Sequence, residues 1–211
     1  MPADLIHLVR HGEVHNPEGI LYGRIPGYHL SDLGHRMADA AAESLMGHHV
    51  TRLYASPLQR TQESAQPWAS RFGLEIETDD RLVEPYNWFE GKRFTFPGAL
   101  REAAAWPKLA NPFRPSWGEA FRSVKQRMFA AIENAWVATE NGEAVLVSHQ
   151  MPIVMVARSV AGRPLFHDPR RRRCTLSSIT TLRREGDRFV EVSYREPAKE
   201  LLTSAVDLGA V

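Results

Sequence analysis

The sequence has almost no cysteine, no long apolar run and no excess of charge of either sign. Cys174 is the single cysteine among 211 residues, so no disulfide can form within the chain, and a reducing cytoplasm is the expected location. The N-terminal stretch MPADLIHLVRHGE lacks the basic and apolar segments of a secretory signal. The most apolar later stretch, MPIVMVARSVAG, contains Arg158 and is too short to span a bilayer. We therefore expect a soluble protein without a membrane partner.

The balanced charge and the absence of common nucleotide-binding and hydrolase motifs argue against further classes of protein. The 26 basic and 25 acidic residues nearly cancel, so no global field indicates nucleic acid as a partner. The run Arg170–Arg173 is the only dense charge cluster, and a solvated loop explains it better than a nucleic-acid contact or a subsite for a second anionic group. No Walker loop, G-x-G-x-x-G or G-x-S-x-G motif is present. Nothing in the sequence indicates an oligomeric state.

Strand and helix patterns alternate along the chain. Apolar or β-branched runs predict strands at 5–9, 51–56, 74–78 and 142–149. Helical spacing predicts helices at 31–48, 57–72, 118–139 and 152–161. Two further β-rich stretches, 176–184 and 188–196, flank Glu185-Gly186-Asp187 and predict a terminal hairpin. This order predicts an α/β fold, a three-layer α/β/α sandwich around a mostly parallel central sheet.

The segment 85–118 differs in character from the rest of the chain. It contains five prolines together with Tyr86, Trp88, Trp106 and Trp117. Such irregular, aromatic-rich segments are typical of lids and pocket walls. We therefore expect one domain spanning 1–211, with 85–118 as a small inserted lid over a substrate pocket.

Polar side chains follow three of the predicted strands where each one ends. Arg10 and His11 end the first strand, Ser56 leads from the second toward Arg60, and Ser148 with His149 ends a later strand. In open α/β sheets ligands bind beyond the carboxyl ends of the strands. Two arginines and two histidines around one pocket suit a phosphate dianion, because guanidinium groups match phosphate oxygens. A neutral imidazole there can attack phosphorus and form a phosphohistidine.

A leaving alkoxide needs a proton donor, and Glu84 in DDRLVEPYNWFEGK is the favoured carboxyl. It follows the third strand on the pocket side of the predicted insertion. A carboxyl beside aromatic walls should have a pKa high enough to act as an acid near neutrality. Glu13 and Glu90 are rival acids, although Glu13 lies very close to the nucleophile in the chain.

Four blocks in order resemble the histidine phosphatase superfamily, the phosphoglycerate mutase-like proteins. They are LVRHGE (8–13), LSDLGHRMA (30–38), YASPLQRTQESA (54–65) and VLVSH (145–149), and the Glu84 region lies between the last two. The resemblance implies His11 as the phosphorylated nucleophile and Glu84 as proton donor. It implies that the phosphoryl group is bound by Arg10, Arg60 and His149, with Asn16 at a site one residue earlier than is typical. The chain also departs from the family in having Gln150 where glycine usually follows the second histidine.

The spacing of three histidines offers a metal site as an alternative. His7, His11 and His15 are four residues apart, which would suit metal ligands on a helix, but the stretch is predicted as strand and loop. We therefore expect no metal and no cofactor. The leading hypothesis is a metal-independent phosphomonoester hydrolase acting on a small phosphorylated substrate. The alternatives are a cofactor-dependent phosphoglycerate mutase and, in another class, a non-catalytic phospho-ligand binder.

Overall fold

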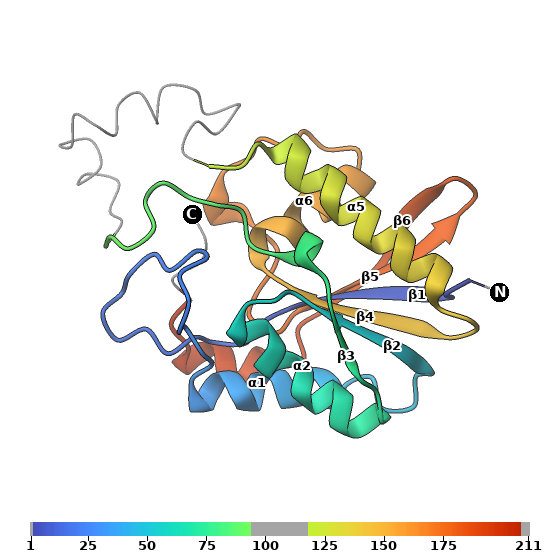
Figure 1. The fold of residues 1–211 in the computed structure, drawn as a ribbon, viewed down its shortest axis with the longest axis horizontal. Helices are drawn as coiled ribbons and strands as arrows, with labels where there is room; N and C mark the ends of the chain where they lie inside the picture. Colours follow the sequence, from blue (N-terminus) through green and yellow to red (C-terminus); the bar gives the residue numbers. More distant parts are fainter. Residues whose placement is uncertain (1, 94–117, 208–211) are drawn as a thin grey trace.

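The computed structural model describes residues 2–93 and 118–207 and contains a single six-stranded sheet (Figure 1). The strands are β1 (Leu5–Arg10), β2 (Val50–Ala55), β3 (Ile76–Thr78), β4 (Glu143–Ser148), β5 (Ile179–Glu185) and β6 (Arg188–Arg195). The α-helices are α1 (Asp32–Glu43), α2 (Gln59–Phe72), α5 (Phe121–Ala138) and α6 (Gln150–Val160). Short 3-10 helices are η1 (Asp80–Leu82), η3 (Pro169–Arg171) and η4 (Lys199–Ser204). None of the described helices has the length and apolar character needed to cross a membrane.

The sheet has the order β3-β2-β4-β1-β5-β6. The first four strands in this order pair in parallel, whereas β5 and β6 add an antiparallel hairpin at one edge. The predicted mostly parallel sheet with a terminal hairpin is therefore confirmed. Because β1, β2 and β4 run in the same direction, their carboxyl ends lie at the same edge of the sheet.

Helices cover both faces of the sheet (Figure 1). Ile6 and Leu8 of β1 face a core built with α5 and α6, whereas Val9 packs in a second core with α1 and α2. These alternate side chains are buried on both faces, as expected for a central parallel strand. The predicted three-layer α/β/α architecture is confirmed.

Element boundaries differ from the predictions where local turns intervene. Helix α1 begins after Ser31, whose side chain accepts a hydrogen bond from the Gly34 amide, but it ends at Glu43 instead of continuing to 48. Residues beyond it form tight turns that include Gly47 at φ 93°. Helix α2 ends at Phe72 and is followed by Gly73 in the left-handed conformation. Strand β3 therefore begins at 76 instead of 74.

The predicted insertion 85–118 lies mostly outside the described residues, because 94–117 are not described. Its two described ends are joined by an antiparallel bridge between Asn87 and Gly118. The amide of Glu119 also donates to the carbonyl of Tyr86, at 3.2 Å. The segment therefore leaves and rejoins the domain at one place, while its expected role as a lid stays a prediction.

Candidate active site

The side chains predicted from the strand ends meet at the carboxyl edge of the sheet. A small cavity there is lined by Arg10, His11, Leu21, Tyr22, Gly23, Arg60, Glu84 and Gln150. The rings of His11 and His149 lie with their centroids 5.2 Å apart. His149 also lies 3.3 Å from Arg60 Nη2 and 3.7 Å from Glu84 Oε2, measured from its Nδ1. Five of the six predicted site residues therefore share one location.

His11 has one ring nitrogen with an available lone pair. Its Nδ1 lies 2.7 Å from the carbonyl oxygen of Gly12. A carbonyl only accepts, so Nδ1 carries the proton and Nε2 keeps its lone pair. Burial is the main cause that lowers the pKa of His11 well below its ordinary value, and Arg60 and Arg10 lower it further. The imidazole is therefore neutral around neutral pH and able to attack an electrophile.

A close backbone approach holds the loop that carries His11 against the start of α1. A Cβ added at Gly12 would fall on the Gly34 carbonyl, and one added at Gly34 would fall on the Glu13 carbonyl. The amide of Gly12 donates to Ser64 Oγ of α2 at 3.1 Å. Only glycine at both positions permits this packing, which fixes the loop that carries His11. Gly34 lies within the LSDLGHRMA block, but its contact partner was not predictable from that block.

Arg10 is buried at the end of β1 and forms a two-armed ion pair. Its Nη1 and Nη2 donate to the two carboxylate oxygens of Asp207 at 2.7 and 2.6 Å, and Nη1 also donates to the Cys174 carbonyl. Burial alone would lower the pKa of Arg10, but the charge and hydrogen bonds of Asp207 outweigh it and the pKa is raised. Arg10 therefore stays charged. Asp207 was not predicted, because a lone aspartate near the end of the sequence gives no signal.

Arg60 enters the cavity from the first turn of α2. Its Nη2 donates to the Gly23 carbonyl at 2.7 Å, and its guanidinium carbon lies 4.8 Å from the centre of the Tyr22 ring. Burial lowers the pKa of Arg60, although a guanidinium remains protonated near neutrality. Tyr22 thus supports this cation from one face, a contact that the sequence did not reveal.

Glu84 is a buried carboxyl surrounded by cations and histidine. It follows η1, and the preceding Leu82 carbonyl accepts a hydrogen bond from Ser148 at the end of β4, at 2.7 Å. Burial raises the pKa of Glu84 to about 7, against the opposing effects of Arg60, Arg172 and Arg10. A carboxyl with this pKa exchanges a proton near neutrality, which suits a general acid and base.

Three buried polar atoms around this cavity lack a hydrogen-bond partner. They are Nε of Arg10, Nε of Arg60 and Oε1 of Glu84. Buried polar groups without partners are rare in folded proteins, and a catalytic or binding role is one explanation for them. Two cationic donors and one protonatable carboxyl are the complement of an oxyanion ester, so the cavity can bind and protonate such a group.

The rival acids are engaged elsewhere. Glu13 accepts hydrogen bonds from the Ser31 hydroxyl and from the Val206 amide, and Glu90 accepts from the Asn87 amide at 2.9 Å. Neither is among the residues that line the cavity. Glu84 is therefore the carboxyl that geometry favours as the acid.

Asn16 does not reach the cavity. Its side chain bonds the amide and carbonyl of Ile20 at 3.1 and 2.8 Å, and it lines a neighbouring hollow with Tyr22 and Asp207. In this structure Asn16 closes its own loop, and its expected part in phosphate binding stays a prediction.

Gln150 and the arginine run meet at the rim. Gln150 Oε1 accepts from Arg172 Nη1 at 3.1 Å, and Gln150 Nε2 donates to the Cys174 carbonyl at 3.3 Å. By contrast, Arg170 and Arg171 are 87% and 88% exposed in their side chains and pair with Asp168. The run is therefore divided between solvated residues and one cation beside the site.

Comparisons with known proteins identify the family of this chain. The family model described as "Histidine phosphatase superfamily (branch 1)" matches residues 6–197. An uncharacterized protein of Mycobacterium tuberculosis, Rv0525, is 49% identical over 200 residues, which cover 94% of this chain and 99% of that protein. A probable phosphoglycerate mutase, GpmB of Yersinia pestis, is 29% identical over 182 residues, covering 82% of this chain and 83% of that protein.

A solved structure shares the fold at lower identity. The mycobacterial glucosyl-3-phosphoglycerate phosphatase Rv2419c in complex with inorganic phosphate superposes with a TM-score of 0.72 at 22% identity, covering 93% of this chain and 99% of that one. At this identity the likeness supports the architecture alone. Because the family model matches most of its length, the chain belongs to branch 1 of the histidine phosphatase superfamily.

Proposed function

We propose that this protein is a metal-independent phosphomonoester hydrolase that acts through a phosphohistidine on His11, with Glu84 as proton donor. The observation that carries the proposal is the cavity in which two arginines, a neutral histidine and a raised-pKa carboxyl meet. Its unpartnered Arg10 and Arg60 nitrogens supply donors for the phosphoryl oxygens. A small phosphorylated molecule is the expected substrate.

In the first step, His11 Nε2 attacks phosphorus while the bond from phosphorus to the ester oxygen breaks. Arg10, Arg60 and His149 hold the phosphoryl oxygens during this transfer, where charge is spread over them. Protonated Glu84 gives its proton to the leaving oxygen, which departs as an alcohol. The products of this step are the alcohol, the phosphohistidine and the Glu84 carboxylate.

In the second step, the Glu84 carboxylate accepts a proton from water as the water oxygen attacks phosphorus. The bond between phosphorus and Nε2 breaks, and inorganic phosphate leaves. Neutral His11 and protonated Glu84 are restored. A pKa of about 7 suits a group that must hold the proton in one step and accept it in the next.

The second candidate function is that of a phosphoglycerate mutase. GpmB, which is 29% identical to this chain, is named a probable phosphoglycerate mutase. A mutase has to exclude water and return the phosphoryl group to a second hydroxyl. The compact spacing between Glu84 and His149 favours the hydrolase. A binder without catalysis would need neither the free Nε2 nor the raised-pKa carboxyl, which makes it the weakest alternative.

The test is a screen of phosphorylated metabolites and an aryl phosphate with released phosphate as the readout, with and without a chelator. We expect turnover that the chelator leaves unchanged. Conversion of 3-phosphoglycerate to 2-phosphoglycerate, dependent on the bisphosphate, would establish the mutase instead. Absence of turnover for every substrate with His11 intact would support the binder.

Two wider expectations belong to the same proposal. The segment 85–118 contributes a pocket wall, because Asn87 lies three residues after Glu84 in the sequence and is bridged to Gly118 at the base of the segment. A cytoplasmic location is consistent with Cys174, which is buried and whose thiol pKa is raised to about 11 by that burial.

A further inference from the structure

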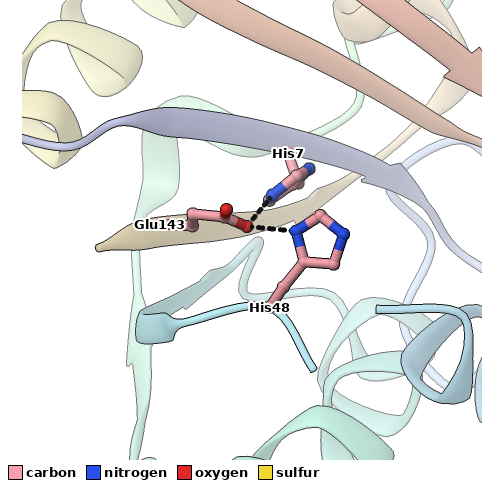
Figure 2. Close-up of side chains that lie close together, drawn as sticks. All are labelled: His7, His48 and Glu143. Atoms are coloured by element: carbon pink, nitrogen blue, oxygen red, sulfur yellow. Dashed lines mark hydrogen bonds and ion pairs between the residues drawn. The ribbon is translucent and has the colours of Figure 1, made fainter. Parts of the chain in front are cut away.

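Two histidines and a glutamate lie close together outside the candidate active site (Figure 2). His7 comes from β1, Glu143 begins β4, and His48 lies in the connection between α1 and β2. Their ligating atoms all lie within 4.8 Å of one another. None of the three has a role in the proposed phosphoryl transfer, because the catalytic cavity lies at the opposite ends of β1 and β4.

Strand register places the first two groups together. Leu5 is paired with Glu143 and His7 with Val145 in the parallel β1–β4 ladder, so His7 and Glu143 are diagonal neighbours on one face of the sheet. His7 Nε2 lies 2.7 Å from Glu143 Oε2. The His7 side chain is 2% exposed, and the Glu143 side chain is 13% exposed. The sheet itself therefore holds two of the three groups in position.

The third group is delivered by a loop that is tied to the same strand. The amide of Glu143 donates to the His49 carbonyl at 2.8 Å, which anchors the chain next to His48. His48 Nδ1 lies 2.8 Å from the same Glu143 Oε2 that His7 contacts. Figure 2 shows both rings directed at this one oxygen. Because the His48 side chain is 36% exposed, the cluster is open to solvent on that side.

We propose that His7, His48 and Glu143 bind a transition-metal dication, Zn²⁺ foremost, with water in the remaining position. Two imidazole nitrogens and one carboxylate oxygen form a ligand set that Zn²⁺ accepts with tetrahedral geometry. Such ligand atoms are about 3.3 Å apart around Zn²⁺. The two contacts to Glu143 must therefore open by about half an ångström from 2.7 and 2.8 Å. Rotation of the exposed His48 side chain and of Glu143 can supply that movement.

A further contact orients the buried ligand for this role. His7 Nδ1 lies 3.0 Å from Thr181 Oγ1 on β5. While Nε2 donates to the Glu143 carboxylate, Nδ1 accepts from the Thr181 hydroxyl. Metal binding uses the other tautomer, in which Nδ1 donates to this hydroxyl and the lone pair of Nε2 points toward the cluster. Metal-binding histidines commonly make such a second hydrogen bond, which fixes the ring and its tautomer. The ion would join β1, β4 and the α1–β2 connection and would act on stability, since it lies away from the reacting groups.

The experiment uses the full-length protein freed of metal by a chelator and then dialysed. Competition between the protein and a chromogenic zinc indicator should give one equivalent of Zn²⁺ with a dissociation constant below about 1 µM. The midpoint of thermal unfolding should rise with Zn²⁺ and stay unchanged with Mg²⁺, which prefers an all-oxygen environment.

Two substitutions at accessible cluster positions test the ligands without removing the buried histidine. His48→Ala and Glu143→Gln should each weaken Zn²⁺ binding at least about tenfold and abolish the thermal shift. His35→Ala, at an exposed histidine of α1 outside the cluster, should leave both unchanged. Phosphatase activity should be the same in the wild type and in His48→Ala.

The alternative is that the three side chains form a hydrogen-bonded cluster only. Absence of Zn²⁺ binding at micromolar free metal, with no thermal shift, would establish that alternative. Undiminished binding in both ligand variants would also overturn the proposal, because the ion would then occupy another place. Neither result depends on whether the protein hydrolyses phosphate esters.

Discussion

The two ends of the β1–β4 strand pair carry the same set of side chains in different surroundings. At the carboxyl end, His11 and His149 lie near Glu84, and at the amino end, His7 and His48 lie near Glu143. Glu84 is 3.7 Å from its nearest imidazole nitrogen among these contacts, whereas Glu143 is hydrogen-bonded by two imidazoles at 2.7 and 2.8 Å. The difference shows that the residue types alone do not decide the chemistry.

Surroundings set opposite proton affinities for the two carboxyls. Burial without a hydrogen-bond partner on Oε1 raises the pKa of Glu84 to about 7. Burial also acts on Glu143, but the hydrogen bonds from His7 and His48 outweigh it and lower the pKa of that carboxyl. One end is therefore suited to proton transfer and the other to holding a fixed negative charge.

Replacing His11, the proposed nucleophile, should have the largest effect on activity. His11→Ala should reduce turnover of an aryl phosphate at least about 10⁴-fold, because no covalent intermediate can form. Acid-quenched protein incubated with labelled substrate should lose the labelled phosphohistidine. His48→Ala, the matched change at the other end, should keep both activity and labelling. Persistent labelling of the His11 variant would assign the nucleophile to another residue.

Removal of Glu84, the proposed proton donor, should have an effect that depends on the leaving group. Glu84→Gln should slow hydrolysis of alkyl phosphates by about 10²–10³-fold, since an alkoxide leaves poorly without a proton. Nitrophenyl phosphate should be affected far less, because its leaving group is stable as an anion. Rates measured across a series of esters check this. Equal losses for both ester types would contradict the acid role of Glu84.

The pH dependence of kcat/KM should show whether Glu84 is the group that supplies the proton. With Glu84 acting as the acid at a pKa of about 7, kcat/KM for an alkyl phosphate should fall as pH rises through about 7. The Glu84→Gln variant should lack this descending limb. A limb of unchanged midpoint in the variant would assign the titration to another group.

The two carboxyls should also differ in their effect on stability, with opposite signs. The folded-state pKa of Glu84, about 7, lies above its ordinary value of 4.5, so its contribution is complete below about pH 4.5 and is lost as pH rises through 7. Ionised Glu84 lowers the free energy of unfolding by up to about 3 kcal/mol at pH 8 relative to pH 4.5. Glu84→Gln should therefore stabilise the protein at pH 8 and have little effect at pH 4.5.

For Glu143 the expected change in the free energy of unfolding is smaller and has the opposite sign. The pKa of Glu143 is lowered, so its contribution is present above its ordinary pKa and is lost as pH falls through the folded-state value. Glu143→Gln should destabilise the metal-free protein by about 1–2 kcal/mol near neutrality. Urea unfolding at pH 8 and at pH 5 measures both variants. The same sign for both at pH 8 would contradict the contrast between the two environments.

The sequence allowed the carboxyl-end site to be predicted because its parts follow strand ends. Apolar runs identify the strands, and the polar residues that follow them must meet when the strands are parallel. The architecture and the meeting of His11, Arg60 and Glu84 were predictable in this way. The exact ends of α1 and β3 were not, because left-handed turns at Gly47 and Gly73 decide them.

The remaining features depend on contacts that no local pattern encodes. Asp207 meets Arg10 across 197 positions, and an isolated aspartate has no signal of its own. The sequence spacing groups His7 with His11 and His15, whereas its partners lie in the α1–β2 connection and on β4. Strand register, which sequence patterns leave open, brings His7 and Glu143 together.

The ion pair between Arg10 and Asp207 has a consequence for the order in which the protein is made. The ribosome produces the first strand long before the segment that follows η4. The ion pair can therefore form only after a residue 197 positions further along the chain has been synthesised, so one cation of the candidate site receives its carboxylate partner late in synthesis.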